Sequence, residues 1–387
     1  MRVIHIVHGR CNPNEHNGIS RVVYYLNKYE KLAGIQSEIW AVVDKTNTHY
    51  SYPRDEFVTV ECYPRVIPGV FKTYEIINAL KAEKDTIDLV HFHMIWFYDK
   101  NVIAKELNAL KIPYIITTHG TYSTQHAYTG KRLIAKSLYE LDYLKKATAI
   151  HIITREEGTG LQKYGYSGPV VLAYNGVEAD EIPSRYNHEF FAEKPYRSKI
   201  KLGWVGVLRE DKNLMSLIKA VAMLSDEKRK QFVVVLVGPD YRGNAAKYLN
   251  YADELGCRDN FDWIGPLYNQ EKYDAIYNFD AYIMASFSEG FSMAILDAMA
   301  CGKPCLLTRG CSMTYFNYPP RDFFVMCEPY PYDIARGINE LLNKKEQWSE
   351  MGQHAKQWVQ SDFNWEKIVQ TMKHNYEQVL KGKFDVE

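Results

Sequence analysis

The chain has 387 residues, in which 47 Lys and Arg balance 47 Asp and Glu, and 46% of the residues are hydrophobic. These values are average for a globular protein and exclude a disordered or fibrous chain. The balanced charge also argues against a nucleic-acid partner. At roughly 150 residues per domain, the length predicts two domains.

The sequence predicts a cytoplasmic protein. Apolar runs stay short of the ~18 residues that cross a bilayer. The first strand-like segment continues into polar His8-Gly9-Arg10 without a cleavage site. The seven Cys form no C-x-x-C pair and no His/Cys cluster at zinc spacing, so we expect free buried thiols.

Short β-branched runs alternate with segments of helical period, which predicts parallel βαβ units and doubly wound α/β domains. In the first half we expect strands over Val3 to Val7, Ser37 to Val43, Leu89 to His93, Tyr114 to Thr118, Ala149 to Ile153 and Val170 to Ala173. In the second half we expect them over Lys201 to Val205, Phe232 to Val237, Phe261 to Ile264, Ala281 to Ala285 and Pro304 to Thr308.

These strands predict an N-terminal domain over residues 1–190 and a C-terminal domain over residues 191–362. The connection should lie within Glu178 to Lys199, which is rich in charge, Pro and aromatics and has no clean period. Residues 363–387 should form a C-terminal helix, because apolar residues recur at helical spacing between Trp365 and Leu380. We expect this helix to return to the first domain.

The segment from Ala285 to Pro304 is the most informative. A strand ends near Ala285, a polar loop follows, and residues 293–301 should form a helix with Ser292 as its N-cap and Gly302 as its stop. The N–H groups of Gly290 to Met293 and the helix dipole then make an anion site that fits a diphosphate. Taken alone, Glu289 could be a dipole partner and Asp297 part of a solvated face.

The spacing Glu289-x7-Asp297 resembles the E-x7-E signature of retaining glycosyltransferases, and the words Glu-Gly-Phe, Ala-Met-Ala-Cys-Gly and Lys-Pro resemble those of glycosyltransferase family 4. The resemblance implies a glycosyltransferase B (GT-B) fold, with two Rossmann-like domains facing across a cleft. It also implies that Glu289 contacts the hydroxyls of the donor sugar, that Gly290, Phe291 and Ser292 bind the donor, and that Asp297 binds the ribose. Asp297 is one methylene shorter than the family's Glu.

A second segment, Trp204 to Asn213, resembles the family's G-R-L-x-x-E-K-G loop, whose Arg and Lys neutralise the donor diphosphate. Lys212 matches the Lys. Val207 stands where the family has Arg, so the guanidinium role falls to Arg209 through a local shift of the loop.

Two segments of the first domain also resemble the family. Gly18 matches one Gly of its Gly-Gly loop, where Asn17 replaces the other, and His119 matches the His of a Thr-x-His segment that faces the reacting sugar. We interpret His93 as structural and Asn175-Gly-Val-Glu178 as a turn.

The sequence has no phosphate-binding G-x-x-x-x-G-K-[ST] loop, no G-x-G-x-x-G after the first strand and no D-x-D motif. We therefore expect no cofactor and no metal. Residues Lys131 to Lys146 should form an amphipathic helix, which is either an ordinary surface helix or a face for an anionic membrane.

The resemblance thus predicts a retaining, metal-independent hexosyltransferase. It would move sugar from a UDP- or GDP-linked donor to a glycan or lipid-linked acceptor in glycan or cell-surface polysaccharide synthesis, with peripheral contact at the inner membrane face. The alternatives are a nucleotide-sugar epimerase or sugar phosphorylase on the same fold, and a non-catalytic nucleotide-sugar-binding subunit. Val207, Asn17 and Asp297 favour the last alternative.

Overall fold

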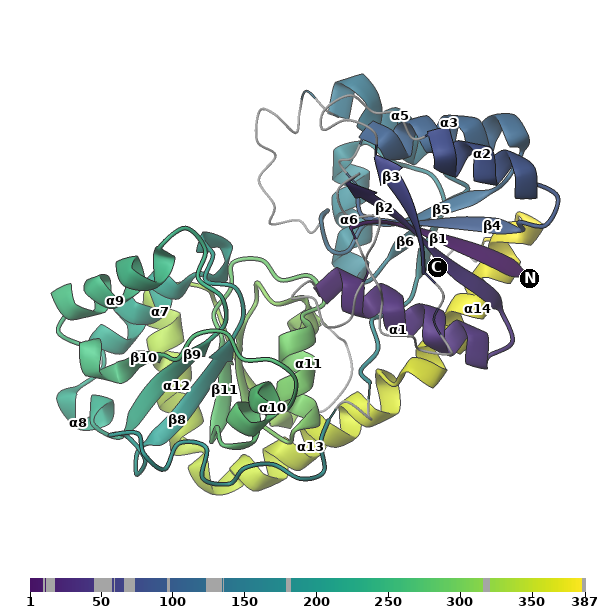
Figure 1. The fold of residues 1–387 in the computed structure, drawn as a ribbon. Coiled ribbons are helices and arrows are strands. Elements are labelled where there is room, and N and C mark those ends of the chain that lie inside the picture. Colours follow the sequence, from purple (N-terminus) through teal and green to yellow (C-terminus); the bar gives the residue numbers. More distant parts are fainter. Residues whose placement is uncertain are drawn as a thin grey trace. The chain divides into compact units, whose positions relative to one another are not determined.

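The computed structural model describes residues 1–9, 11, 18–44, 58, 60–65, 74–95, 98–122, 134, 136–178, 182–315 and 321–384. The chain divides into two compact units, one made of Met1–Gly176 with Trp365–Glu387 and the other of Val177–Asn364. Each unit is a parallel sheet with helices on its faces (Figure 1). This confirms the predicted pair of doubly wound α/β domains.

The first unit has a seven-stranded sheet of order β3-β2-β1-β4-β5-β6-β7. Its strands are β1 (Arg2–His8), β2 (Gln36–Asp44), β3 (Val60–Arg65), β4 (Leu89–His93), β5 (Tyr114–Thr117), β6 (Ala149–Ile152) and β7 (Val170–Leu172). Its helices are α1 (Gly18–Leu32), α2 (Tyr74–Glu83), α3 (Tyr98–Leu110), the π-helical η2 (Lys136–Glu140), α5 (Leu141–Lys145), α6 (Arg155–Tyr164) and α14 (Trp365–Lys381).

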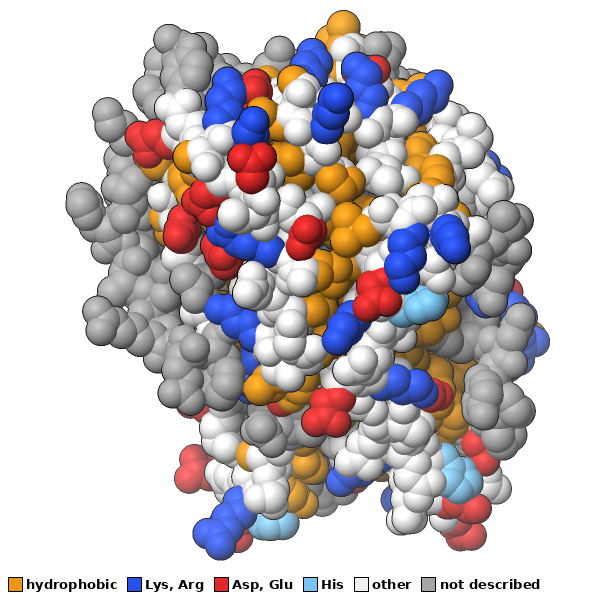
Figure 2. Space-filling view, turned by 90° about the vertical axis from the view of Figure 1, so that its right-hand side faces the viewer, with side chains coloured by type: hydrophobic (Ala, Val, Ile, Leu, Met, Phe, Trp, Pro, Cys, Tyr) orange, Lys and Arg blue, Asp and Glu red, His pale blue; other side chains and the backbone are white. Residues whose placement is uncertain are grey.

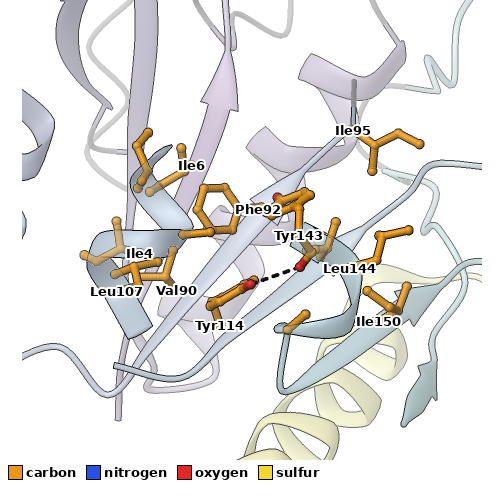
Figure 3. Packing of buried hydrophobic residues seen from close by; sticks show 14 of the residues in the cluster. Ile4, Ile6, Val90, Phe92, Ile95, Leu107, Tyr114, Tyr143, Leu144 and Ile150 are labelled. Carbon is orange, nitrogen blue, oxygen red and sulfur yellow. Dashed lines mark hydrogen bonds between the residues drawn. The ribbon is translucent and has the colours of Figure 1, made fainter. Parts of the chain in front are cut away.

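Successive side chains of a strand point to opposite faces of a sheet, so β1 and β4 place apolar residues on one face and histidines on the other. Ile4 and Phe92 belong to the main apolar core, which Figure 3 shows together with the Tyr114 hydroxyl donating to the carbonyl of Tyr143 at 3.0 Å. The alternate residues of the same strands are His5, His91 and His93. On the other face, His5 contacts Glu30 of α1 and His91 contacts Tyr376 of α14, while His93 bonds His5.

The C-terminal helix α14 returns to the first unit, as predicted. The Trp365 ring stacks on Tyr25 of α1 with 6.4 Å between ring centroids, and the Tyr376 hydroxyl donates to Glu30 Oε1 at 2.7 Å. The buried face of the helix consists of Trp365, Ile368, Val369, Met372, Tyr376 and Val379.

The second unit has a six-stranded parallel sheet of order β10-β9-β8-β11-β12-β13. Its strands are β8 (Ile200–Val205), β9 (Phe232–Val237), β10 (Phe261–Trp263), β11 (Ala281–Met284), β12 (Cys305–Thr308) and β13 (Phe324–Cys327). Its helices are α7 (Leu214–Ala222), α8 (Asp226–Arg229), α9 (Asn244–Glu254), α10 (Asn269–Tyr277), α11 (Met293–Ala300), α12 (Pro331–Asn343) and α13 (Trp348–Asp362).

The boundary between the units lies at Val177, earlier than the predicted 190, because the connecting segment packs on the second unit. The Tyr186 ring stacks on Tyr277 with 4.3 Å between centroids, and the Tyr196 hydroxyl donates to Asp262 at 2.6 Å. The Val177 N–H donates to the Phe363 carbonyl at 2.6 Å. The chain therefore enters and leaves the second unit at adjacent points.

The distribution of charged side chains and the state of the cysteines agree with what the sequence predicts. Lys and Arg side chains are interspersed with Asp and Glu on the face that Figure 2 shows. All seven Cys are free thiols; six are buried and Cys62 is partly buried. Among the described residues, no helix is both long and apolar enough to cross a membrane.

Candidate functional site

Two loops of the second unit meet at the carboxyl ends of the neighbouring strands β8 and β11. The first, Gly206 to Asn213, contains a 3-10 turn over Glu210–Lys212; the second precedes α11. The Phe287 N–H donates to the carbonyl of Asp211 at 3.1 Å. Asn213 has a φ of 59°, and its amide donates to the carbonyl of Ala285 at 2.9 Å. These bonds fix the two loops against each other.

The fixed loops bring Lys212 and Glu289 together. The Lys212 ammonium makes an ion pair with Glu289 Oε1, and the two side chains are 15% and 11% exposed. The Ser286 hydroxyl donates to the same carboxylate oxygen at 3.4 Å. The motif positions singled out in the sequence thus place a cation and a carboxylate side by side at the carboxyl edge of the sheet.

The backbone of Glu289 is held by the loop after β12. Its N–H donates to the carbonyl of Gly310 at 2.7 Å, and its carbonyl accepts from the Ser312 N–H at 3.0 Å. A Cβ on Gly310 would lie 2.1 Å from the carbonyl oxygen of Ser286, so this close approach requires glycine. Sequence reasoning missed Asn213, Gly310 and Ser312, which position the Glu289 carboxylate.

Arg209 takes part less directly than predicted. Its Nε and Nη2 donate to the carboxylate of Asp211 at 2.9 and 2.6 Å, and this bond raises the pKa of the guanidinium. Asp211 Oδ2 lies 4.0 Å from Lys212 Nζ. Arg209, which is 49% exposed, is therefore linked to the ion pair through Asp211.

Helix α11 begins at Met293, as predicted, and ends at Ala300, one residue before the predicted end. Ser292 occupies the N-cap position without a side-chain capping bond, and Gly302 follows the helix with a φ of 73°. The first N–H groups of a helix lack intrahelical partners and carry the positive end of its dipole. The Phe291 ring is buried and packs on Phe363 with 5.1 Å between centroids. Gly290 is partly exposed.

Asp297 does not lie on a solvated face: it is 3% exposed. Its Oδ2 accepts from Lys272 Nζ at 3.0 Å, and the Tyr273 hydroxyl lies 3.4 Å from its Oδ1. An ionised carboxylate has about four lone-pair positions, so it can accept several hydrogen bonds at once. Nothing in the sequence pointed to Lys272, which lies on the separate helix α10.

In the first unit, His119 follows β5 with a φ of 50°. Glu157 holds the surrounding turn, because its carboxylate accepts from the Thr118 hydroxyl and from the Gly120 N–H, the latter at 2.6 Å. The His119 side chain is partly buried. Burial lowers its pKa to about 3, so the imidazole is neutral at ordinary pH.

Gly18 is the first residue of α1 and is exposed. A Cβ added there would meet nothing within 4 Å among the described residues, so packing inside the unit does not explain a glycine at this position. Asn17, the other residue of the predicted loop, lies outside the described residues.

A cluster of buried histidines extends from His119 into the first unit, and sequence reasoning had noted only His93. The nitrogens of His5, His91 and His93 lie within 4.8 Å of one another, a spacing that could hold a metal ion. However, His5 Nδ1 and His93 Nε2 already share a hydrogen bond at 2.9 Å, and His5 Nε2 is bonded to Glu30 at 2.6 Å. The arrangement therefore fits a hydrogen-bond network better than a metal centre.

Comparison with known proteins identifies the family. Residues 186–358 match the model of glycosyl transferases group 1, and residues 16–181 match that of Glycosyltransferase Family 4. Together these regions span most of the sequence. The chain therefore belongs to the glycosyltransferases, with one domain from each of these families.

Relatives and solved structures agree. The chain is 24% identical to an uncharacterized glycosyltransferase of Methanocaldococcus jannaschii over 86% of this chain and 84% of that protein. It is 27% identical to N-acetyl-alpha-D-glucosaminyl L-malate synthase of Bacillus anthracis over 85% and 86%. The Anabaena protein HepE in complex with UDP shares the fold, with a TM-score of 0.76 and 15% identity over 98% of this chain and 100% of that one. The fold is GT-B.

Proposed function

We propose that the protein is a retaining glycosyltransferase that moves a sugar from a nucleotide diphosphate sugar to an acceptor hydroxyl in glycan synthesis. The observation that carries the proposal is the Lys212–Glu289 ion pair next to the start of α11. A diphosphate needs positive charge and N–H donors, and a sugar needs hydrogen-bond acceptors. The second unit places both kinds of group at one edge of its sheet.

In this proposal the diphosphate binds Lys212 and the first turn of α11, while Glu289 accepts from sugar hydroxyls. The ammonium has three donors, so Lys212 can bind a phosphate oxygen and keep its contact with Glu289. Asp297 accepts from the ribose hydroxyls while it remains bonded to Lys272. Binding of UDP by the structurally similar HepE supports a uridine-linked donor, and a guanosine-linked donor is the second candidate.

The proposed mechanism follows from where charge develops. As the bond between sugar and phosphate breaks, negative charge grows on the diphosphate and positive charge grows on the sugar ring. Lys212 is placed to stabilise the negative charge on the diphosphate, and Arg209 acts beside it through Asp211. Preorganised charge of this kind favours the transition state over the ground state. The departing phosphate takes the proton of the acceptor hydroxyl, on the same face of the sugar.

We propose that the first unit binds the acceptor, a glycan or a lipid-linked sugar, and that the protein works peripherally at the cytoplasmic face of a membrane. The described part of the 131–146 segment supports the membrane contact, because Ile134 is 61% exposed and Leu138 is 73% exposed. Apolar side chains among basic ones favour an anionic lipid surface.

The function is tested by binding first and turnover second. Thermal unfolding is measured with UDP, GDP and ADP and with their sugars, because a ligand at about 100 times its Kd stabilises the folded state by about 2.7 kcal/mol. Purified protein is then incubated with the stabilising nucleotide sugar and candidate acceptors, and the anomeric configuration of the product is read by NMR.

Three outcomes would contradict the proposal. An inverted product would exclude retention. A changed sugar without acceptor, or dependence on inorganic phosphate, would identify an epimerase or a phosphorylase. Tight nucleotide binding without turnover across the acceptor panel would favour a non-catalytic subunit.

A further inference from the structure

His119 is the end of a buried hydrogen-bond chain that starts at Glu30. Glu30 Oε2 lies 2.6 Å from His5 Nε2, His5 Nδ1 lies 2.9 Å from His93 Nε2, and His93 Nδ1 lies 3.1 Å from His119 Nε2. Glu30, His5 and His93 are at most 1% exposed. Each imidazole in this chain uses one nitrogen toward each neighbour, so the protonation of one ring dictates that of the next.

A second chain leaves the other oxygen of Glu30. Glu30 Oε1 lies 2.7 Å from the Tyr376 hydroxyl, which lies 2.8 Å from His91 Nδ1. His91 Nε2 lies 2.5 Å from Thr117 Oγ1, which lies 2.7 Å from His151 Nδ1. The chain ends where His151 Nε2 lies 3.0 Å from the carbonyl oxygen of Ala173. A carbonyl can only accept a hydrogen bond, so this end fixes the direction of the chain.

The protons of the second chain can be counted from the carbonyl. His151 Nε2 must carry hydrogen, so a neutral His151 accepts from the Thr117 hydroxyl at Nδ1. Thr117 in turn accepts from His91 Nε2, and a neutral His91 would then need the hydrogen of the Tyr376 hydroxyl. Tyr376 has only that hydrogen and donates it to Glu30 Oε1, so the second chain holds one proton more than an ionised Glu30 with neutral imidazoles. This extra proton balances the negative charge of Glu30, so the whole network has no net charge.

The first chain then has a single direction. Glu30 Oε2 remains an acceptor, which it already is toward the Ser37 hydroxyl at 2.5 Å, and takes the hydrogen of His5 Nε2. His5 Nδ1 is then bare and accepts from His93 Nε2, and His93 Nδ1 accepts from His119 Nε2. The opposite direction needs a second extra proton, which would leave an uncompensated charge in a fully buried cluster.

We propose that the relay of Glu30, His5 and His93 holds His119 as the neutral Nε2–H tautomer, so that its bare Nδ1 accepts a hydrogen bond from a ligand hydroxyl. Nδ1 has no hydrogen-bond partner among the described residues, and the side chain is partly exposed. A bare nitrogen attracts O–H groups and repels phosphate oxygens. His5, His93 and Glu30 are thus positioning residues. That the hydroxyl belongs to a sugar rests on the proposed function.

Protein labelled with ¹⁵N-histidine tests the tautomer directly. In each neutral ring the protonated and the bare nitrogen differ in chemical shift and in coupling to the ring hydrogens, and the His119 signals are assigned from the spectrum of His119→Asn. At pH 7 we expect hydrogen on Nε2 and none on Nδ1. Hydrogen on Nδ1, alone or together with Nε2, would overturn the proposal.

A matched pair of variants tests the relay. His93→Phe removes the acceptor of His119 Nε2, so the wild-type preference for one tautomer should give way to a mixture. Tyr114→Phe removes a buried hydrogen bond of the same unit that is not part of the network, and it should leave the His119 tautomer unchanged. If His119 keeps the single Nε2–H tautomer in the His93→Phe variant, the relay does not determine the tautomer of His119.

The spectra do not depend on activity. The expected tautomer in a protein that transfers no sugar would keep the relay and contradict only the proposed function.

Discussion

The ammonium of Lys212 contacts the carboxylate of Glu289, which lies 77 positions later in the chain. Two backbone-fixed loops hold the pair, so the two side chains meet in the protein without any ligand. A donor diphosphate would therefore find its cation already ordered, and the entropy of ordering this side chain would not oppose binding.

Lys212→Ala should weaken donor binding and turnover together, because its charge is assigned to a group that is negative in the donor and more negative as it leaves. We expect the affinity for the nucleotide diphosphate to fall by about 1.5–3 kcal/mol, the range for charge-assisted hydrogen bonds. Calorimetry measures this loss of affinity. Lys247→Ala is the control, because Lys247 is 51% exposed and makes an ion pair with the exposed Glu210. Equal affinities in the two variants would remove Lys212 from the site.

Asp297→Ala should lower both nucleotide affinity and stability. The affinity loss should again be about 1.5–3 kcal/mol if the carboxylate binds the ribose. Stability should fall because the variant leaves Lys272, 18% exposed, without its partner. Lys272→Met separates the two effects, since it breaks the same pair but keeps the carboxylate. Loss of stability in both variants with unchanged nucleotide affinity in Asp297→Ala would make Asp297 a structural acid.

His119→Ala should depress turnover more than donor affinity if its side chain acts on the reacting sugar. In the wild-type protein, turnover should show no ionisation of His119 between about pH 5 and 8, because burial lowers its pKa to about 3. Steady-state rates across this range, together with nucleotide binding at pH 7, check both expectations. A fall in donor affinity as large as the fall in turnover would assign His119 to ground-state binding.

The buried histidines should make the protein sensitive to acid. Burial lowers the pKa of His151 to about 4, and it lowers that of His91 and His93 well below the usual value. The unfolded chain binds protons at these rings below about pH 6.5, whereas the folded protein does not. Stability should therefore be full above pH 6.5 and decline as the pH falls toward 4, by about 1.4 kcal/mol per pH unit for each such proton.

Urea unfolding at several pH values measures this decline. His151→Asn should flatten it, whereas replacement of the exposed His374 by Asn should not. A stability that does not change between pH 7 and 5 would contradict the assigned pKa shifts.

Activity should persist in excess chelator. The sequence lacks a D-x-D motif, and the second unit supplies Lys212 and the start of α11 where a cation would otherwise bind the diphosphate. A complete loss of activity that added magnesium reverses would disprove metal independence.

The sequence predicted every strand of the two sheets except β3 and β13, each of which lies at one edge of its sheet. Central parallel strands are buried on both faces and are continuous β-branched runs, such as Phe232–Val237. The edge strand β3 contains Glu61 and Pro64, residues that keep an edge from pairing further and that also mask its strand character. The extent of the second unit was also missed, because aromatics such as Tyr186 show no period that assigns them to it.

At the candidate site, the sequence predicted the residues that belong to recognisable motifs. It missed the residues that contact them only in the folded protein. Lys212 and Glu289 were identified and do meet. Asn213, Lys272 and Glu30 act through contacts between elements that are distant along the chain, for which single-sequence patterns carry no signal. The shift proposed for Arg209 overlooked Asp211, which holds the guanidinium two residues away.

Because α14 belongs to the first unit but is the last helix of the chain, the unit that is begun first on the ribosome is completed last. Residues 177–364 must be synthesised before Tyr376 can reach Glu30 and His91. At about 5–20 residues per second, that interval is roughly 10–40 s. Throughout it the first unit carries an uncovered apolar face and a histidine network that lacks one of its hydroxyls. The nascent N-terminal half should therefore be a target for chaperones, and a separately supplied α14 peptide should restore its fold.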